Sequence, residues 1–233
     1  TVEPAFNIPA RWIHESEKMA ADIAGYTLID PTSVIITHLS EIIKSHAHEL
    51  LSRQDVKTML DKLKATNPTV VEDIVPGIVS VQYLQKVLCI LLKESVPIRD
   101  LQTILETLAD NQHTLKDADI TTEYVRQALK RTITRRFAEG GQIRVLTLDT
   151  ETENKIVASV KKSEQGSYLA MEPQAIQQLV SSINTQIEKI KDIVSAPIVL
   201  TSPIVRIYFK KLIDQFIPNV TVLSFNEIDN SVQ

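Results

Sequence analysis

Residues 1–51 mix short apolar runs with prolines, a pattern that predicts a small region of mixed secondary structure. Proline fixes its own backbone and restricts the residue before it, so the Pro-rich start is expected to be irregular or extended. The expected elements, in order, are an irregular piece over 3–9, a strand over 11–13, a helix over 15–24 that ends at Gly25, and a strand over 26–29. This region is therefore expected to be α+β.

A second helix is expected to begin at Asp30 and Pro31. Aspartate is a good N-cap acceptor, and proline is well tolerated in the first turn. Apolar residues then recur at nearly helical spacing up to the end of the region. We expect this helix to bury Val34, Ile35, Leu39, Ile42, Ile43, Leu50 and Leu51.

Residues 52–137 carry apolar stripes of helical spacing, separated by short polar or Pro-containing connections. The expected helices cover 53–63, a short piece from Asn67-Pro68 to Pro76-Gly77, 80–93, 98–108 and 121–137. Their expected core residues include Val56, Leu60, Leu84, Val87, Leu88, Leu91, Leu101, Ile104, Leu105, Leu108, Val125, Leu129 and Ile133. Short loops between amphipathic helices predict a compact all-helical middle subdomain.

The pattern changes after residues 138–141, which include Gly140 and Gly141. Strands expected at 143–148, 168–171, 197–200 and 220–225 alternate with helices expected at 150–161, 173–193 and 203–216. Such alternation predicts a largely parallel sheet covered by helices. The predicted fold class is thus mixed α/β in three subdomains: a small α+β region over 1–51, the helical region over 52–137 and an α/β region over 142–233.

Composition excludes several classes of function. The chain has 25 Lys plus Arg and 29 Asp plus Glu, a formal net charge of −4, whereas nucleic-acid binders usually carry a strongly basic face. It has 5 glycines, and none of their spacings matches a dinucleotide fingerprint or a P-loop. A single cysteine excludes an internal disulfide. No apolar run approaches the ~18 residues of a membrane span, so the chain is expected to be soluble.

Residues that often carry chemistry do not form a recognisable site. His46 and His48 lie two positions apart, which on one continuous helix points them away from each other and argues against a shared metal ion. Cys89 lies among apolar residues and is expected to behave as a small hydrophobe. No Gly-x-Ser-x-Gly elbow and no pair of carboxylates stands out. We therefore expect no enzyme activity, no metal and no cofactor.

A basic stripe, Arg126, Lys130, Arg131, Arg135 and Arg136, allows two interpretations. It could face the phosphates of a nucleic acid, or it could place cations near a helix C-terminus, where the helix dipole favours them. No aromatic residues for base stacking are interleaved with it. An ion-pair role within the chain or at a subunit interface is therefore favoured.

Two further apolar patterns could serve a partner. The stripe Ile176, Val180, Ile183, Ile187, Ile190 and Val194 could be a coiled-coil seam, although packing on a sheet is favoured. Phe6 and Trp12 lie in the Pro-rich segment, where an aromatic side chain can line a groove or fill a small core. The residue types alone indicate a non-catalytic binding module.

Four blocks of the sequence resemble the FHIPEP family of flagellar type III export gate proteins. Residues 25–41 read Gly-Tyr-Thr-Leu-Ile-Asp-Pro-Thr-Ser-Val-Ile-Ile-Thr-His-Leu-Ser-Glu, similar to the family's Gly-Tyr-Thr-Val-Val-Asp-Pro-Ala-Thr-Val-Val-Ala-Thr-His-Leu-Ser-Glu. The blocks at 46–54, 96–109 and 122–129 are similar too and follow in the family's order. The first block is the flagellar version rather than the one usual in virulence secretion.

The resemblance implies an N-terminal integral-membrane half and a cytoplasmic half of four subdomains. The cytoplasmic half forms a nine-membered ring at the inner membrane of bacteria and docks export chaperones with their filament-type substrates. This chain would be the latter part of that half, with residues 1–51 a remnant of the first and second subdomains. The implied partners are those chaperone complexes, other export-apparatus proteins and further copies of the chain, with no nucleic acid. Membrane contact would come only through the N-terminal half.

The family's chaperone-docking dimple uses an Asp-Pro-Ala-Phe stretch and the Thr of Thr-His-Leu. The matching positions here are Glu3, Phe6 and Thr37. The resemblance implies that Phe6 supplies apolar area, that Glu3 supplies a carboxylate at the rim, and that Thr37 keeps the dimple open because it is small. Glutamate departs from the family's aspartate by one methylene, which leaves the charge and alters the rim geometry.

Three alternatives stay open at this point. The chain could belong to a virulence-type export gate rather than a flagellar one. An enzyme would require a pocket of convergent polar groups at the strand ends of the α/β region. A nucleic-acid-binding helical adaptor would use the basic stripe and would bind DNA with steep salt dependence.

Overall fold

The computed structural model describes residues 1–163, 166–190, 197–218 and 220–232, and it divides the chain into two compact units. Unit 1 is Thr1–Leu50 and unit 2 is Leu51–Gln233. The mixture of many helices with a small parallel sheet confirms the predicted mixed α/β fold class. The finer division into three subdomains stays a prediction.

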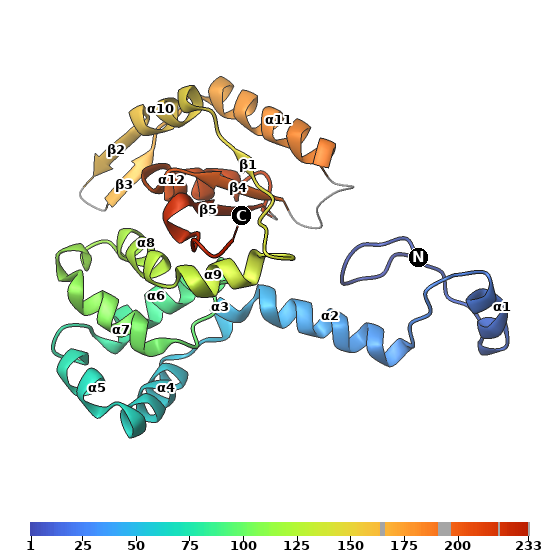
Figure 1. The fold of residues 1–233 in the computed structure, drawn as a ribbon, viewed down its shortest axis with the longest axis horizontal. Coiled ribbons are helices and arrows are strands. Elements are labelled where there is room, and N and C mark those ends of the chain that lie inside the picture. The colour runs from blue at the N-terminus through green and yellow to red at the C-terminus, as the bar shows by residue number, and fades with distance from the viewer. Residues whose placement is uncertain (164–165, 191–196, 219, 233) are drawn as a thin grey trace. The chain divides into compact units, whose positions relative to one another are not determined.

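Unit 1 contains one long helix, α2, and shorter helical elements (Figure 1). Its elements are η1 (Glu15–Glu17), α1 (Lys18–Ile23), α2 (Pro31–Ser45) and α3 (Ala47–Leu50). Two predicted boundaries hold. Gly25, with a φ of +80°, follows α1, and α2 begins after Asp30, whose Oδ1 accepts a 2.9 Å bond from Ser33 N.

Two predictions for unit 1 are wrong. Residues 11–13 and 26–29 are not strands, because neither segment has a neighbouring strand with which to form a ladder. The helix that begins at Pro31 does not bury its apolar residues: Ile35, Leu39, Ile42, Ile43 and Leu50 are exposed and Val34 is half-buried. No side chain of residues 1–50 is fully buried, so unit 1 has no core of its own.

The helix after Asp30 also ends earlier than predicted. It stops at Ser45, and the backbone at His46 (φ −104°, ψ 11°) separates it from α3. The break lets both imidazoles approach one carboxylate: His46 Nδ1 lies 2.9 Å from Glu49 Oε1, and His48 Nε2 lies 3.7 Å from the same atom. The expectation that the two histidines point apart is therefore wrong, because it assumed one continuous helix.

The helical part of unit 2 follows the predicted order. Its helices are α4 (Arg53–Thr66), α5 (Pro68–Ile74), α6 (Val81–Lys93), α7 (Leu101–Asp110), α8 (Ala118–Ala128) and α9 (Lys130–Phe137). The single helix predicted over 121–137 is divided at Leu129 (φ −85°, ψ 12°). No glycine or proline marks this break, so the sequence pattern could not show it.

The α/β part of unit 2 contains a three-stranded parallel sheet in the order β1-β4-β5. Its strands are β1 (Leu146–Thr147), β4 (Ile198–Thr201) and β5 (Thr221–Ser224), and its helices are α10 (Thr150–Ala158), α11 (Pro173–Ile190) and α12 (Pro203–Ile213). Pairs such as Val199 with Val222 set the register. The predicted parallel sheet is confirmed, with three strands rather than four.

The remaining predicted strand, at 168–171, belongs elsewhere. It forms β3 (Gly166–Leu169), which pairs antiparallel with β2 (Val160–Ser163) in a separate hairpin.

The helix predicted over 150–161 ends at Ala158, because the chain then enters β2. The end of the helix predicted over 173–193, with Val194, lies outside the described residues. Within α11, Val180, Ile183 and Ile187 pack on the α/β core, as favoured over a coiled-coil seam.

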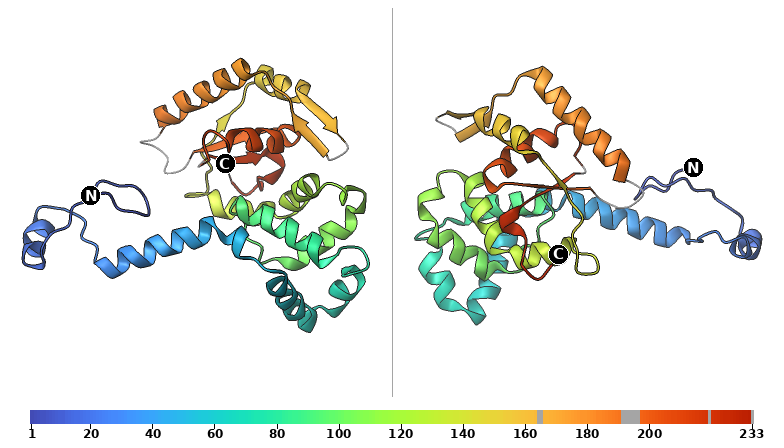
Figure 2. Two further views of the ribbon diagram at one scale, coloured as in Figure 1. Left: turned by 180° about the vertical axis from the view of Figure 1, so that it is seen from behind. Right: turned by 45° about the horizontal axis from the view of Figure 1, so that its top comes forward.

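The parallel sheet serves two apolar cores at once. Ile198 and Leu223 belong to the core formed with α4–α9, whereas Val199 and Val222 belong to a second core formed with α10, α11 and α12. This alternation follows from the period of two along a strand. Figures 1 and 2 accordingly show α10 and α11 on the opposite side of the sheet from α6 and α8.

A buried group of charged residues, here named the Arg–Glu cluster, joins the same two parts of unit 2. It consists of Glu94, Glu123, Arg126, Arg206 and Glu227. Arg206 Nη1 lies 2.6 Å from Glu94 Oε2, and Arg206 also contacts Glu123 through two of its nitrogens. Arg126 donates to Glu227 Oε2 at 2.6 Å and to Glu94 Oε2 at 3.1 Å.

The charges of the Arg–Glu cluster do not cancel, because two guanidinium groups face three carboxylates. Burial would raise the pKa of Glu94, but the charges of Arg126 and Arg206 outweigh burial and lower this pKa to about 2. At Glu123 burial prevails and raises the pKa, although Arg206 acts against it. Of these two carboxyl groups, Glu123 therefore takes up a proton more readily, and protonation there would balance the charges of the cluster.

Replacement of Arg206 by Met should leave three buried carboxylates with one guanidinium. We expect a loss of about 3–5 kcal/mol in the free energy of unfolding, because an uncompensated buried charge is costly. Lys211→Met is the matched control on the same helix, since Lys211 contacts Asp119 at the surface and should cost less than about 1 kcal/mol. Urea unfolding measures both. Equal losses would contradict the assigned role of the cluster.

Acidification should also weaken unit 2 through Glu94. Below its ordinary value of 4.5, the unfolded carboxyl binds a proton that the folded one, with a pKa of about 2, does not. Up to about 3 kcal/mol of stability should therefore be lost as the pH falls from 4.5 toward 2. Because Glu94→Gln cannot titrate, the stability difference between wild type and variant should shrink across this window. A constant difference would contradict the prediction.

Candidate functional site

The first ten residues form a closed loop that presents Phe6. Val2 and Pro9 form an isolated antiparallel bridge, and Ala10 N donates to Thr1 O at 3.0 Å. Nearer the tip, Glu3 N donates to Ile8 O at 2.8 Å. The Pro-rich start is thus held together by its own backbone hydrogen bonds rather than by an element that packs on it.

Glu3 closes the tip of this loop from inside. Its Oε1 accepts a 3.0 Å bond from Ala5 N, and its Oε2 accepts a 2.7 Å bond from Phe6 N. Asn7 N donates to Glu3 O at 2.9 Å, and Asn7 has a φ of +57°. Both carboxylate oxygens of Glu3 therefore already accept hydrogen bonds within the loop. Besides carrying a charge, Glu3 holds the backbone that presents Phe6.

Phe6 projects from this loop and is 60% exposed. Trp12, in the following segment, is 65% exposed. Neither ring fills a core, so the alternative that Phe6 plugs a small core does not apply in unit 1. An exposed phenyl ring on a hydrogen-bonded loop can supply apolar area to a partner with little ordering cost.

Thr37 lies in the middle of α2 and is half-buried. Among residues 1–50, all of which are described, no hydrogen bond or ion pair links the 1–10 loop to α2. The structure thus places Glu3 and Phe6 together and does not join them to Thr37. The dimple that combines the three residues stays a prediction.

Helix α2 also exposes large apolar side chains. Ile35, Ile36 and Leu39 on α2 are each more than half exposed. A soluble monomer rarely exposes many large apolar side chains together, and such exposure marks an interaction surface. Unit 1 therefore offers exposed apolar side chains to a partner.

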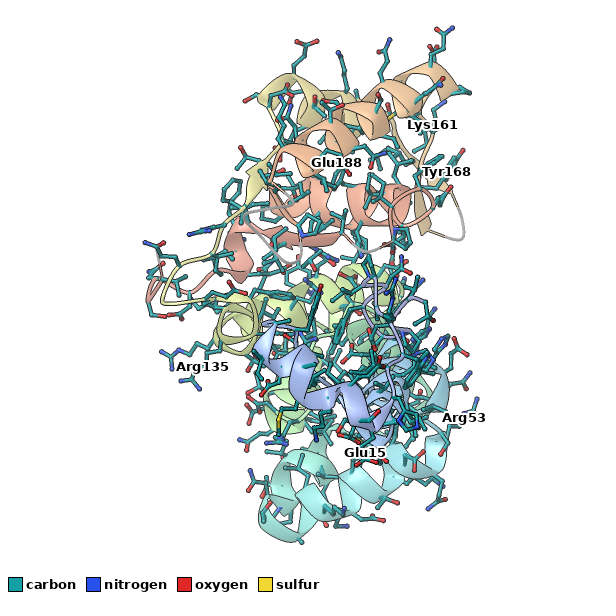
Figure 3. The ribbon with its side chains drawn as sticks, turned by 90° about the vertical axis from the view of Figure 1, so that its right-hand side faces the viewer. Glu15, Arg53, Arg135, Lys161, Tyr168 and Glu188 are labelled. Atoms are coloured by element: carbon teal, nitrogen blue, oxygen red, sulfur yellow. The ribbon has the colours of Figure 1, made fainter. Side chains whose placement is uncertain are left out.

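The basic stripe of the sequence is divided by the structure. Arg126 is buried in the Arg–Glu cluster, which confirms an ion-pair role within the chain for that residue. Arg131 lies 3.5 Å from Asp229, and Arg136 lies over the Phe137 ring at 5.8 Å. Arg135 projects from α9 to the solvent (Figure 3). The five cations do not form one face.

Cys89 and the possible metal ligands are the described groups that bear on catalytic chemistry. Cys89 is half-buried, and burial raises the pKa of its thiol, which makes the thiolate scarcer. Over the described ranges, no three His, Cys, Asp or Glu side chains are placed to hold a metal ion. In the same ranges no helix combines the length and apolar character needed to cross a membrane.

Most residues of the Arg–Glu cluster were not identified from the sequence. Glu94 and Arg206 lie 112 positions apart, and no local pattern links them. Glu227 follows the last strand without any periodic signal. Arg126 was the one member of the Arg–Glu cluster for which the sequence favoured an ion pair.

Removal of the Glu3 carboxylate should loosen the loop that presents Phe6. We expect Glu3→Ala to speed hydrogen exchange at the Ala5 and Phe6 amides roughly tenfold, because each hydrogen bond contributes about 1 kcal/mol. Glu3→Asp, which keeps the carboxylate on a shorter side chain, should retain part of the protection. Glu17→Ala, which removes the bond from His14 N, is the control and should leave Ala5 and Phe6 unchanged. Unaltered exchange in Glu3→Ala would refute the assigned role.

The FHIPEP family model matches residues 1–233. The flagellar biosynthesis protein FlhA of Bacillus subtilis (strain 168) is 44% identical over 234 residues, which cover 100% of this chain and 35% of that protein. The FlhA of Escherichia coli (strain K12) is 35% identical over 232 residues, covering 99% of this chain and 33% of that protein. The chain spans about a third of the length of these curated relatives.

Solved structures of similar proteins share the fold. The Chlamydia pneumoniae CdsV protein has a TM-score of 0.87 at 32% identity over 97% of this chain and 65% of its own, and its complex with CdsO has a TM-score of 0.83 at 31% identity over 95% and 65%. Nonameric EPEC SctV-C has a TM-score of 0.78 at 29% identity over 94% of this chain and 66% of its own. Together with the match over residues 1–233, these similarities show that the chain belongs to the FHIPEP family.

Proposed function

We propose that this chain is part of the cytoplasmic docking platform of a flagellar type III export gate. There it binds export chaperones that carry filament-type substrates and passes them toward the export channel. The observation that carries the proposal is the exposed Phe6, held on a loop that is closed by its own hydrogen bonds. Membership of the FHIPEP family supports it.

The flagellar assignment is favoured over a virulence-type gate by sequence identity. The flagellar relatives of Bacillus subtilis and Escherichia coli are 44% and 35% identical, whereas the CdsV and SctV-C structures are 32% and 29% identical. The likeness to those structures, at TM-scores of 0.87 and 0.78, supports a shared architecture for both kinds of gate. Architecture alone therefore does not separate them.

The proposed mechanism is docking without catalysis. A short apolar motif of the chaperone packs against Phe6 and against the apolar residues of α2, as amphipathic helices dock in grooves. Glu3 fixes the loop so that the ring is presented before the partner arrives, which lowers the entropic cost of binding. Thr37 is small and leaves room for the motif beside the α2 backbone.

The proposed partners extend beyond chaperones. SctV-C was solved as a nonamer and CdsV in complex with CdsO, which supports a ring of copies of this chain and contact with other export-apparatus proteins. The location proposed is the cytoplasmic face of the bacterial inner membrane, with the membrane-spanning half supplied by the longer protein.

The two alternative functions gain no support from the geometry. An enzyme needs convergent polar groups in a pocket, and the charged residues that do converge form the buried Arg–Glu cluster. A nucleic-acid adaptor needs a continuous basic face, and Arg126 is buried while Arg131 pairs with Asp229.

Phe6→Ala and Thr37→Met should each weaken binding of a flagellar chaperone–filament-protein complex. Loss of a buried phenyl ring removes about 1.5–3 kcal/mol, or roughly tenfold to a hundredfold in Kd. Methionine at position 37 should fill the space that the motif needs. Isothermal titration calorimetry measures both, and circular dichroism confirms that the fold is intact.

Thr32→Met is the matched control for Thr37→Met. Thr32 is exposed on the same helix, five positions earlier and so about 140° around it, and its replacement should leave Kd unchanged. Unchanged affinity in both Phe6→Ala and Thr37→Met would remove the site assignment. If the wild-type chain itself does not bind, a chimera with this chain in place of the matching part of Bacillus subtilis FlhA repeats the test, and failure there would refute the docking role.

A further inference from the structure

A hollow of about 490 Å³ lies on unit 2. It is lined by Arg53, Ser80, Gln82, Tyr83, Gln85, Lys86 and Cys89. All but one of these residues belong to α6 or its N-cap, and Arg53 begins α4. The lining contains two cations and no acidic side chain, so its charge is unbalanced.

The two cations are free to bind a partner. Throughout the ranges that the structure describes, neither Arg53 nor Lys86 has an acidic group within ion-pair distance. Both side chains are exposed, and Figure 3 shows Arg53 at the surface. Lys64 and Lys155, by contrast, each pair with a glutamate on the surface.

Three of the residues that line the hollow are held by hydrogen bonds. Gln85 Nε2 donates to Leu51 O at 2.8 Å, which ties the start of α4 to α6. Ser80 Oγ accepts from Tyr83 N at 3.1 Å, and Tyr83 OH donates to Thr121 Oγ1 at 2.9 Å. Ser80, Tyr83 and Gln85 are therefore held in place, and the exposed Arg53 and Lys86 side chains lie beside them in the lining.

We propose that this hollow binds an acidic peptide segment of a partner protein, with its carboxylates on Arg53 and Lys86. Gln82, Gln85, Lys86 and Cys89 follow one stripe of α6, which rises about 10 Å from Gln82 to Cys89. Lys86 is the cation of this stripe, and Arg53 lines the same hollow from the start of α4. In an extended peptide, alternate side chains lie about 7 Å apart on one side, so one acidic residue can face Lys86 while another faces Arg53. The helix N-termini at Ser52 and Ser80 add positive potential at the same end.

This site does not depend on the dimple proposed for unit 1. It lies on unit 2 and recognises charge, whereas the Phe6 surface recognises apolar side chains. Failure of one proposal therefore leaves the other standing, and the two tests use different probes.

Cys89 allows a direct test, because it is the single cysteine and it lines the hollow. An alternating Glu-Ser hexapeptide should slow alkylation of Cys89 by iodoacetamide, a neutral reagent, in the whole chain. The matching Gln-Ser peptide should not slow it. Fluorescence anisotropy of the labelled Glu-Ser peptide gives its Kd in parallel.

Arg53→Gln and Lys86→Gln should each raise that Kd about threefold to fivefold, as expected for one exposed charge pair. Lys62→Gln is the matched control, since Lys62 is exposed on α4 about 180° around the helix from Arg53, and it should leave Kd unchanged.

Three results would overturn the proposal. The first is alkylation of Cys89 at the same rate with and without the Glu-Ser peptide. The second is an equal loss of affinity in Lys62→Gln, which would mean unspecific attraction to a positive surface. The third is equal protection of Cys89 by inorganic phosphate at the same concentration, which would assign the hollow to small anions instead of a peptide.

Discussion

The Arg–Glu cluster is the constraint on which the arrangement of unit 2 depends. Two buried guanidinium groups on α8 and α12 can be stable only if carboxylates from α6, α8 and the segment after β5 meet them. This requirement fixes the helical part against the α/β part more specifically than apolar packing does, because a displaced carboxylate would leave a buried charge without a partner. Apolar contacts supply most of the burial, and the cluster selects one geometry among those that bury the same area.

Much of the fold was predictable because helical periodicity is a local property. Helices α4 to α7 lie close to their predicted positions, since their apolar residues recur every three or four positions and each start has a capping residue. The errors fall where a partner decides the structure. Residues 26–29 have the composition of a strand but no neighbouring strand in unit 1. The strand predicted at 168–171 forms β3, which pairs with β2 rather than with the parallel sheet.

The candidate sites were predictable to different degrees. The Phe6 surface followed from a family resemblance, and the exposure of its ring agrees with an open binding surface. The position of Glu3 within the loop could not be predicted, because it depends on two backbone amides that only a turn brings together. The hollow beside Arg53 was missed for a similar reason: α4 and α6 meet there through tertiary contacts, although 28 positions separate Arg53 from Val81.

The parallel sheet that serves two cores has a consequence for how this family can evolve. Successive residues of β4 face different cores, so a change at Ile198 must suit the helices before the sheet, and a change at Val199 must suit those around it. A recombination event that exchanged only residues after the 138–141 turn would bring in β4, β5 and Arg206 from one parent against Glu94 and Glu123 from another. Crossovers at this turn should therefore be tolerated only between parents whose sheet residues and cluster residues are compatible. The two parts of unit 2 should consequently be inherited together.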